Sequence, residues 1–287
     1  VGTARDGVDA LAKIKELKPN IVTMDVEMPN MGGLEALERI MKTTPLPVIM
    51  VSSLTQEGAE TTMKALSLGC VDFVGKPSGS ISLNIRSVGS ELIEKVVAAS
   101  TASVRSLARG VGGAEAMRQR PRPLLESLAA APQTPRPSAR RREIVAIASS
   151  TGGPMALSEL IPKLPGNFPV PIVVTQHMPP GFTASFAKRL DGASALKVAE
   201  GADGLELKPG LVVIAPGGSH LIFRRRNGAV VCELLDAPPV LSVKPSANIM
   251  FSSVLDEFGG NVLGVILTGM GRDGADGALA LHERGAH

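Results

Sequence analysis

The sequence contains no tryptophan and no tyrosine, and only seven phenylalanines among its 287 residues. Proteins that bind single-stranded nucleic acids stack the bases on such rings, so this class of function is largely excluded. Only two cysteines occur, Cys70 and Cys232, which argues against a disulfide framework and favours a reducing compartment. No apolar run approaches the ~18 residues of a membrane-spanning helix, and no signal peptide is present, so membrane insertion and export are not expected.

Positive charge is in slight excess, but it is distributed unevenly along the chain. The formal net charge is +3 and the sequence pI is about 9.0. Residues 1–100 and residues 143–287 each carry a net charge of −2, whereas residues 101–142 contain nine arginines and five prolines. Because residues 101–142 also lack a sustained apolar period, we expect them to form a linker between two slightly acidic domains. The basic pI therefore does not indicate a nucleic-acid-binding surface.

Both expected domains alternate short apolar runs with amphipathic helical patterns, which predicts parallel sheets covered by helices. In residues 1–100, strands are predicted at 21–25, 47–51 and 71–74. In residues 143–287, strands are predicted at 144–148, 170–175 and 262–267. The runs at 211–215, 220–226 and 229–235 predict a small antiparallel annex. The fold class is therefore α/β, with two doubly wound parallel-sheet domains.

Three polar residues follow the predicted strands of the first domain: Asp25, Ser52 and Lys76. Because ligands of open parallel sheets bind at the carboxyl ends of the strands, we expect the three side chains to share one edge. A carboxylate there can accept a phosphoryl group, with the hydroxyl and the ammonium holding its oxygens. Taken alone, Asp25 fits equally well as an ordinary cap of the next turn or helix.

The segments D-V-E-M-P-x-M-x-G, V-S-S-L-T and the K-P pair after an F-V strand resemble the receiver domain of two-component response regulators. The resemblance implies a flavodoxin-like fold in which Asp25 is the phosphoacceptor, Ser52 the switch hydroxyl and Lys76 the phosphate-binding lysine. It also implies that phosphorylation needs Mg²⁺, with Asp25 and the backbone carbonyl of Glu27 among its ligands. Receivers supply further acidic ligands after their first strand. The first strand and helix are expected to be missing here, so the metal site is expected to be incomplete.

Ser150, His177 and Asp273 each follow a predicted strand of the second domain. Ser150 lies in an S-S-T-G-G turn before a helix, where backbone N–H groups stabilise negative charge, although an ordinary N-cap explains the turn as well. His177 taken alone is as well explained by a packed or surface histidine. Asp273 lies in a G-x-G-x-x-G loop, and a dinucleotide site is the alternative there. The Asp273 carboxylate inside that loop counts against a dinucleotide site. So does the position of the loop, which closes the domain instead of opening it.

Together the three residues can form a triad for acyl transfer. In such a triad His177 takes the hydroxyl proton, Ser150 attacks a carbonyl and Asp273 fixes the imidazole tautomer. Backbone N–H groups near the glycine turns would stabilise the oxyanion.

The motifs A-S-S-T-G-G-P, T-Q-H-M-P-P-G-F-T, K-P-S-A-N-I-M-F and V-I-L-T-G-M-G-R-D-G resemble the catalytic domain of chemotaxis protein-glutamate methylesterases, which follows a receiver in that family. The resemblance implies a Rossmann-like esterase domain that needs no cofactor. Ser150 would be the nucleophile, His177 the base and Asp273 its partner, and Met270 would donate a backbone N–H to the oxyanion. Ser149 departs from the small residues usual at its position, and the family's C-terminal strands are expected to be missing.

The same resemblance implies what the protein acts on. The substrates would be glutamyl methyl esters on the cytoplasmic domains of methylated chemoreceptors, and related enzymes also deamidate glutamine. The phosphodonor would be the chemotaxis histidine kinase, and the location cytoplasmic, without nucleic-acid binding or membrane insertion. The alternative is a response regulator whose output domain binds DNA or a dinucleotide.

Overall fold

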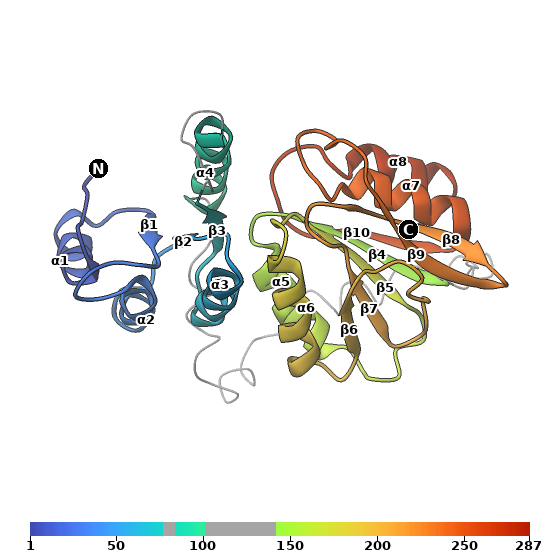
Figure 1. The fold of residues 1–287 in the computed structure, drawn as a ribbon, viewed down its shortest axis with the longest axis horizontal. Coiled ribbons are helices and arrows are strands. Elements are labelled where there is room, and N and C mark those ends of the chain that lie inside the picture. The colour runs from blue at the N-terminus through green and yellow to red at the C-terminus, as the bar shows by residue number, and fades with distance from the viewer. Residues whose placement is uncertain (77–83, 101–141) are drawn as a thin grey trace, which may run out of the picture.

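The computed structural model describes residues 1–76, 84–100 and 142–287 as two α/β units (Figure 1). Nearly all of the expected linker, residues 101–142, lies outside these described ranges. None of the helices in the described ranges combines the length and the apolar character needed to cross a membrane.

The first unit contains a parallel sheet of three strands in the order β1-β2-β3, with four helices. The predicted strands at 21–25, 47–51 and 71–74 are confirmed with small changes at their ends. The elements are α1 (Gly7–Leu17), β1 (Val22–Asp25), α2 (Gly33–Thr43), β2 (Val48–Ser52), α3 (Gln56–Leu68), β3 (Asp72–Gly75) and α4 (Asn84–Ser100).

The second unit contains a parallel sheet of five strands in the order β10-β4-β5-β7-β6 and an antiparallel hairpin of β8 and β9. Its elements are β4 (Ile144–Ser149), α5 (Gly153–Leu160), the short 3-10 helix η3 (Ile161–Lys163), β5 (Ile172–Gln176), α6 (Phe182–Ala193), β6 (Lys197–Glu200), β7 (Leu211–Ile214), β8 (His220–Arg226), β9 (Ala229–Leu235), α7 (Ala247–Phe258), β10 (Val262–Ile266) and α8 (Ala275–Glu283).

One strand was assigned to the wrong sheet from its sequence. Residues 211–215 were expected in the antiparallel annex, but β7 lies inside the parallel sheet, between β5 and β6. The strand β6, Lys197–Glu200, was not predicted because it has a lysine and a glutamate at its ends and is only four residues long. The annex therefore consists of β8 and β9 alone.

Side chains of the buried strand β4 alternate between two cores, one on each face of the five-stranded sheet. Val145 and Ile147 pack in the core under α5 and α6, whereas Ile144, Ala146 and Ala148 pack in the core under α7. Figure 1 shows α5 and α6 on one face and α7 and α8 on the other. This arrangement is the doubly wound sheet that the alternating pattern predicts.

The two units meet through α3 of the first and α6 of the second (Figure 1). The rings of Phe73 and Phe182 stack across this boundary with centroids 4.7 Å apart and planes inclined by 13°. The guanidinium of Arg189 donates a hydrogen bond to the carbonyl of Met63. Met155, in the first turn of α5, packs against the apolar cluster of β2, β3 and α4.

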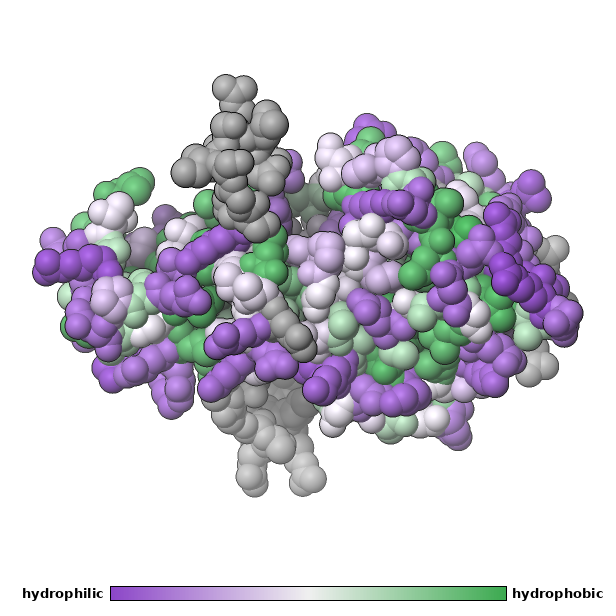
Figure 2. All heavy atoms as spheres, in the orientation of Figure 1, coloured by the Kyte–Doolittle hydropathy of each residue, from purple (hydrophilic) through white to green (hydrophobic). Residues whose placement is uncertain are grey.

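The face shown in Figure 2 carries hydrophilic residues over the outer ends of both units.

Candidate active site

The turn between β4 and α5 holds Ser150 through its backbone on both sides. The N–H of Ser150 donates to the carbonyl of Thr268 at 2.8 Å, and its own carbonyl accepts from the N–H of Gly153 at 2.8 Å. The Thr268 hydroxyl donates to the Thr151 carbonyl at 2.8 Å, so the loop after β10 is tied to this turn twice. Ser150 is half-buried, and its side chain is left at the carboxyl edge of the sheet.

Gln176, the last residue of β5, connects the serine turn to His177. Its side chain is fully buried. The amide oxygen accepts from the Ser149 hydroxyl at 2.7 Å, and the amide nitrogen donates to the carbonyls of Ser150 and His177 at 2.9 and 3.1 Å. Gln176 is not among the residues that the sequence motifs predict for the site, although its position at the end of a buried strand, just before His177, is a usable signal. Gln176 therefore fixes the backbone on both sides of the proposed reaction centre.

Gly269 brings the loop after β10 against the turn that carries Ser150. A Cβ on this residue would lie 2.7 Å from the Cβ of Ser150, closer than two side chains can approach, so only glycine fits. The next residue, Met270, is 40% exposed. Within the described ranges its backbone N–H has no hydrogen-bond acceptor, which leaves it free to donate to a ligand.

His177 and Asp273 form a direct pair. The Nε2 atom of His177 lies 2.8 Å from Oδ2 of Asp273, and the two side chains are 17% and 4% exposed. The structure thus brings two of the three predicted triad residues into contact. Ser150 follows the register pair Ser149–Gln176 on the neighbouring strand, so it lies beside His177. Among the described residues, however, no hydrogen bond joins the Ser150 hydroxyl to His177.

Asp273 also binds the N-terminus of α7. Its Oδ1 atom accepts from the Ser246 hydroxyl at 2.6 Å and the Asn248 N–H at 3.2 Å, and its Oδ2 atom accepts from the Ala247 N–H at 2.6 Å. Burial acts to raise the pKa of Asp273, but hydrogen bonds from His177, Ser246, Ala247 and Asn248 outweigh it and hold the pKa below its usual value. The carboxylate is therefore ionised and available to pair with an imidazolium.

The N-terminus of α8, where the pyrophosphate of a dinucleotide would bind, is already capped by a side chain of the protein. The side-chain oxygen of Asn248 accepts from the N–H groups of Gly274 and Gly277 at 3.1 and 2.9 Å, which caps the N-terminus of α8. The Asp273 carboxylate faces α7 and His177, in the middle of the loop that would hold a pyrophosphate. The geometry therefore favours the triad over the dinucleotide alternative.

The second predicted site lies at the carboxyl edge of the three-stranded sheet. Oδ1 of Asp25 lies 2.8 Å from the Nζ atom of Lys76 and accepts from the N–H of Glu27 at 3.1 Å. Ser52 ends the neighbouring strand, but its buried hydroxyl donates to the carbonyl of Gly58 at 3.1 Å, so it faces α3. The structure thus brings Asp25 and Lys76 together, whereas Ser52 makes no hydrogen bond to Asp25 in the described ranges.

The described residues at this edge do not form a complete Mg²⁺ site. They contain no group of three histidine, cysteine, aspartate or glutamate side chains that could hold a metal. Asp25 is paired with Lys76, and the Glu27 carbonyl is the only other predicted ligand. Mg²⁺ prefers octahedral oxygen ligands and is usually held by one or two carboxylates, whereas the one carboxylate predicted here, that of Asp25, is already paired with Lys76, so the described residues do not fit the ion.

Comparison with known families assigns both units. The family described as CheB methylesterase matches residues 145–287, and the response regulator receiver domain family matches residues 1–86. A protein-glutamate methylesterase/protein-glutamine glutaminase of Thermotoga maritima is 48% identical over 279 residues, which are 97% of this chain and 76% of the relative. A protein of the same name from Symbiobacterium thermophilum is 46% identical over 286 residues, covering 99% of this chain and 77% of the relative.

A solved structure, the CheB methylesterase catalytic domain of Thermotoga maritima, is 48% identical, with a TM-score of 0.49, and covers 50% of this chain and 77% of that one. The relatives extend over nearly the whole of this chain and include both the receiver and the esterase unit. The chain therefore belongs to the CheB family of methylesterases, in which a response-regulator receiver domain precedes the catalytic domain.

Proposed function

We propose that this chain is a phosphorylation-regulated serine esterase that hydrolyses glutamyl methyl esters on chemoreceptors, and that it also deamidates glutamine. Family membership and the pairing of His177 with Asp273 beside Ser150 support the proposal. In it, residues 1–100 are the receiver, 101–142 the linker and 143–287 the catalytic domain. Its partners are the cytoplasmic domains of methylated chemoreceptors and a chemotaxis histidine kinase, in the cytoplasm. The family assignment favours this function over a DNA-binding or dinucleotide-binding output domain.

The proposed mechanism follows from which imidazole nitrogen is engaged. Because Nε2 of His177 donates to Asp273, Nδ1 is the nitrogen that accepts the proton of Ser150. The Ser150 oxygen attacks the ester carbonyl, and His177 passes the proton to the methoxy group, which leaves as methanol. Water then attacks the acyl-enzyme, and His177 takes its proton and returns it to Ser150. The products are glutamate and methanol, and the enzyme is regenerated.

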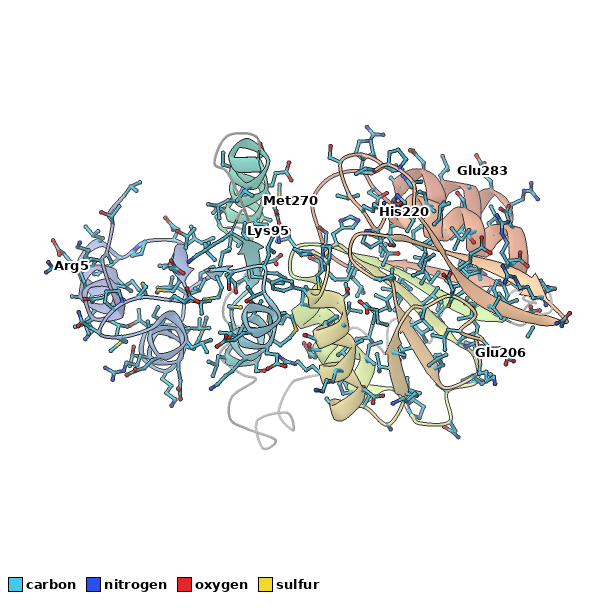
Figure 3. The ribbon with its side chains drawn as sticks, viewed as in Figure 1. Arg5, Lys95, Glu206, His220, Met270 and Glu283 are labelled. Carbon is cyan, nitrogen blue, oxygen red and sulfur yellow. The ribbon has the colours of Figure 1, made fainter. Side chains whose placement is uncertain are left out.

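The developing oxyanion needs donors that are in place before the reaction starts. We assign one of them to the backbone N–H of Met270, because this group has no acceptor in the described part of the chain and adjoins Gly269, which packs on Ser150. Figure 3 places Met270 on the side of the catalytic unit that faces the receiver unit. The esterase side of the site requires no cofactor.

We predict that Gly269→Ala lowers ester hydrolysis by about 100-fold, because its Cβ would displace Ser150 from the position in which it attacks. Gly192→Ala is the matched control, since a Cβ on that α6 glycine meets nothing within 4 Å. Methanol release by the purified full chain measures both. Equal activity of the two variants would contradict the inference that a Cβ at position 269 displaces Ser150.

Regulation is proposed to act through the boundary between the units. Phe182 begins the helix after His177, and Met155 lies in the helix after Ser150, so both contacts with the receiver flank the catalytic turns. On the receiver side, Phe73 belongs to β3, the strand that leads to Lys76, and Lys76 pairs with Asp25. Phosphorylation of Asp25 would shift Lys76 from the carboxylate to the phosphoryl oxygens and thereby loosen the boundary that restricts access to the catalytic site.

We expect Arg189→Ala to raise the activity of the unphosphorylated chain about two- to tenfold, because it removes the hydrogen bond to Met63 that ties α6 to α3. Lys188→Ala is the control, because Lys188 is exposed on the same helix and makes no ion pair in the described ranges. Methanol release without a phosphodonor is the measurement. An Arg189→Ala protein that is no more active than Lys188→Ala would exclude inhibition through this contact.

The proposed function itself is tested by incubating the chain with a receptor cytoplasmic fragment that carries methylated glutamates. We expect the chain to release methanol and to leave free glutamate carboxylates on the receptor fragment. Where glutamine occupies such sites, we expect release of ammonia. Saturable binding of a nicotinamide dinucleotide, or sequence-dependent DNA binding, without methanol release would overturn the proposal.

A further inference from the structure

A buried histidine outside the proposed triad lies behind its carboxylate. His220 begins β8 and is fully buried (Figure 3). Its Nδ1 atom accepts a hydrogen bond from the backbone N–H of Ser246 at 3.0 Å, and its Nε2 atom donates to the carbonyl of Pro238 at 3.1 Å. Both ring nitrogens are therefore occupied in a single neutral tautomer, which fixes the ring and, through it, the backbone of Ser246.

Ser246 joins this histidine to Asp273. Its hydroxyl accepts a long hydrogen bond of 3.4 Å from the N–H of Ile249 and lies 2.6 Å from Oδ1 of Asp273. A carboxylate oxygen can only accept, so the hydroxyl proton points at Asp273. The Ser246 side chain is fully buried, away from bulk solvent.

We propose that Ser246 is a positioning residue of the esterase, which holds the Asp273 carboxylate in the plane that pairs with His177, and that His220 holds Ser246 in place. The proposal rests on the function and triad proposed above. Without the hydroxyl, Oδ1 of Asp273 keeps only the Asn248 N–H, at 3.2 Å, while Oδ2 keeps both His177 and Ala247. With the shortest contact at Oδ1 lost, the remaining hydrogen bonds hold the plane of the carboxylate against the imidazole less firmly.

The expected consequence lies in the chemical step and not in substrate binding. Asp273 sets which nitrogen of His177 carries the proton, and it stabilises the imidazolium. Loosening this pair misplaces the base, and an error of about 1 Å in a catalytic group costs as much as ~100-fold in rate. We therefore expect Ser246→Ala to lower kcat roughly 10- to 100-fold with KM unchanged, and Ser246→Thr, which keeps a hydroxyl, to restore most of it.

A purely structural helix cap would behave differently. Ser246 also caps α7, so its loss lowers thermal stability in either case. The ¹⁵N shifts of the His177 ring separate the two roles, because they report which nitrogen is protonated. We expect a single Nε2–H tautomer of His177 in the wild-type chain and a mixture of tautomers in folded Ser246→Ala. A folded Ser246→Ala protein with the wild-type tautomer and wild-type kcat would overturn the proposal.

His220 supplies a matched pair of substitutions. An asparagine places its amide oxygen near the former Nδ1, where it accepts from Ser246, whereas a glutamine places its amide nitrogen near the former Nε2, toward Pro238. We expect His220→Asn to keep at least tenfold more kcat than His220→Gln, at comparable melting temperature. A higher kcat for His220→Gln than for His220→Asn would show that the contact of His220 with Ser246 does not affect catalysis.

A double substitution shows whether Ser246 acts through Asp273. In an Asp273→Asn background, Ser246→Ala should cause no further loss of kcat, and an undiminished loss would overturn the proposal. Failure of the proposed function is distinguishable from these results, since it would remove methanol release from the wild-type chain as well. The His177 tautomer would still report on Ser246.

Discussion

Replacing Ser150 by alanine should abolish methanol release, with a fall in kcat of about 10³- to 10⁶-fold, because no other group takes over the attack on the ester carbonyl. Whatever rate remains would come from the backbone donors and from substrate binding. Substrate affinity should change little, since the hydroxyl contributes mainly to the chemical step. The measurement is single-turnover hydrolysis of a methyl-esterified receptor fragment by the full chain.

The fold should not respond to this change. The Ser150 hydroxyl makes no hydrogen bond in the described ranges, and the turn is held by backbone contacts that alanine preserves. We expect a free energy of unfolding within about 0.5 kcal/mol of the wild type. Ser158→Ala, on the following helix α5, is the control, because within the described ranges its hydroxyl donates only to the carbonyl of Pro154 in the same helix. Hydrolysis that survives in the Ser150→Ala protein would remove this serine from the mechanism.

The Asp273→Asn protein should lose about 10³- to 10⁴-fold in kcat. Both carboxylate oxygens of Asp273 accept hydrogen bonds, two at each atom. An amide replaces one of these oxygens with an NH₂ group, which then faces a donor, so the His177 pair or the contacts at the N-terminus of α7 must break. We therefore expect a loss of stability of about 1–3 kcal/mol in addition. Urea unfolding together with methanol release measures both effects.

The same substitution has a defined pH signature. Hydrogen bonds hold the pKa of Asp273 below its usual value in the folded protein. Its contribution to stability is therefore present above the unfolded value, about 3.9, and is lost as the pH falls through the lower folded value. Asp273→Asn should lack this part of the acid dependence, whereas Asp276→Asn, at an exposed position in the first turn of α8, should retain it. Identical acid unfolding of Asp273→Asn and the wild type would contradict the hydrogen-bond assignment.

The strands that carry the proposed site were predictable because they are buried on both faces. An uninterrupted apolar run such as 144–148 is typical of a central strand of a parallel sheet. The polar residue that follows such a strand must then lie at the edge of the sheet. By the same reasoning, Asp25 and Lys76 were expected at one edge, and the structure brings them within 2.8 Å. The strand 197–200 has no such run, and 211–215 could be placed only by its pairing with β5 and β6, which the pattern of the strand itself does not encode.

The support around the triad could not be predicted, because it depends on tertiary contacts between distant segments. Ser246 and Asp273 are 27 residues apart, and Ser246 and His220 are 26 apart. His220 lies at the start of a strand that the sequence predicts, but its contact with Ser246 depends on how β8 packs against α7. The orientation of the His177 ring likewise follows from where α7 holds Asp273, which no spacing in the sequence reveals.

That Ser150 is an activated nucleophile can be tested by labelling with a fluorophosphonate ester, which forms a phosphonate ester with serines activated by a neighbouring base and releases fluoride. The full chain is incubated with the reagent, and tandem mass spectrometry distinguishes Ser149 from Ser150. The account predicts one adduct, on Ser150, formed in parallel with the loss of methanol release and strongly slowed in His177→Ala. Loss of activity with the adduct on another residue, or full methanol release by protein labelled stoichiometrically at Ser150, would contradict it.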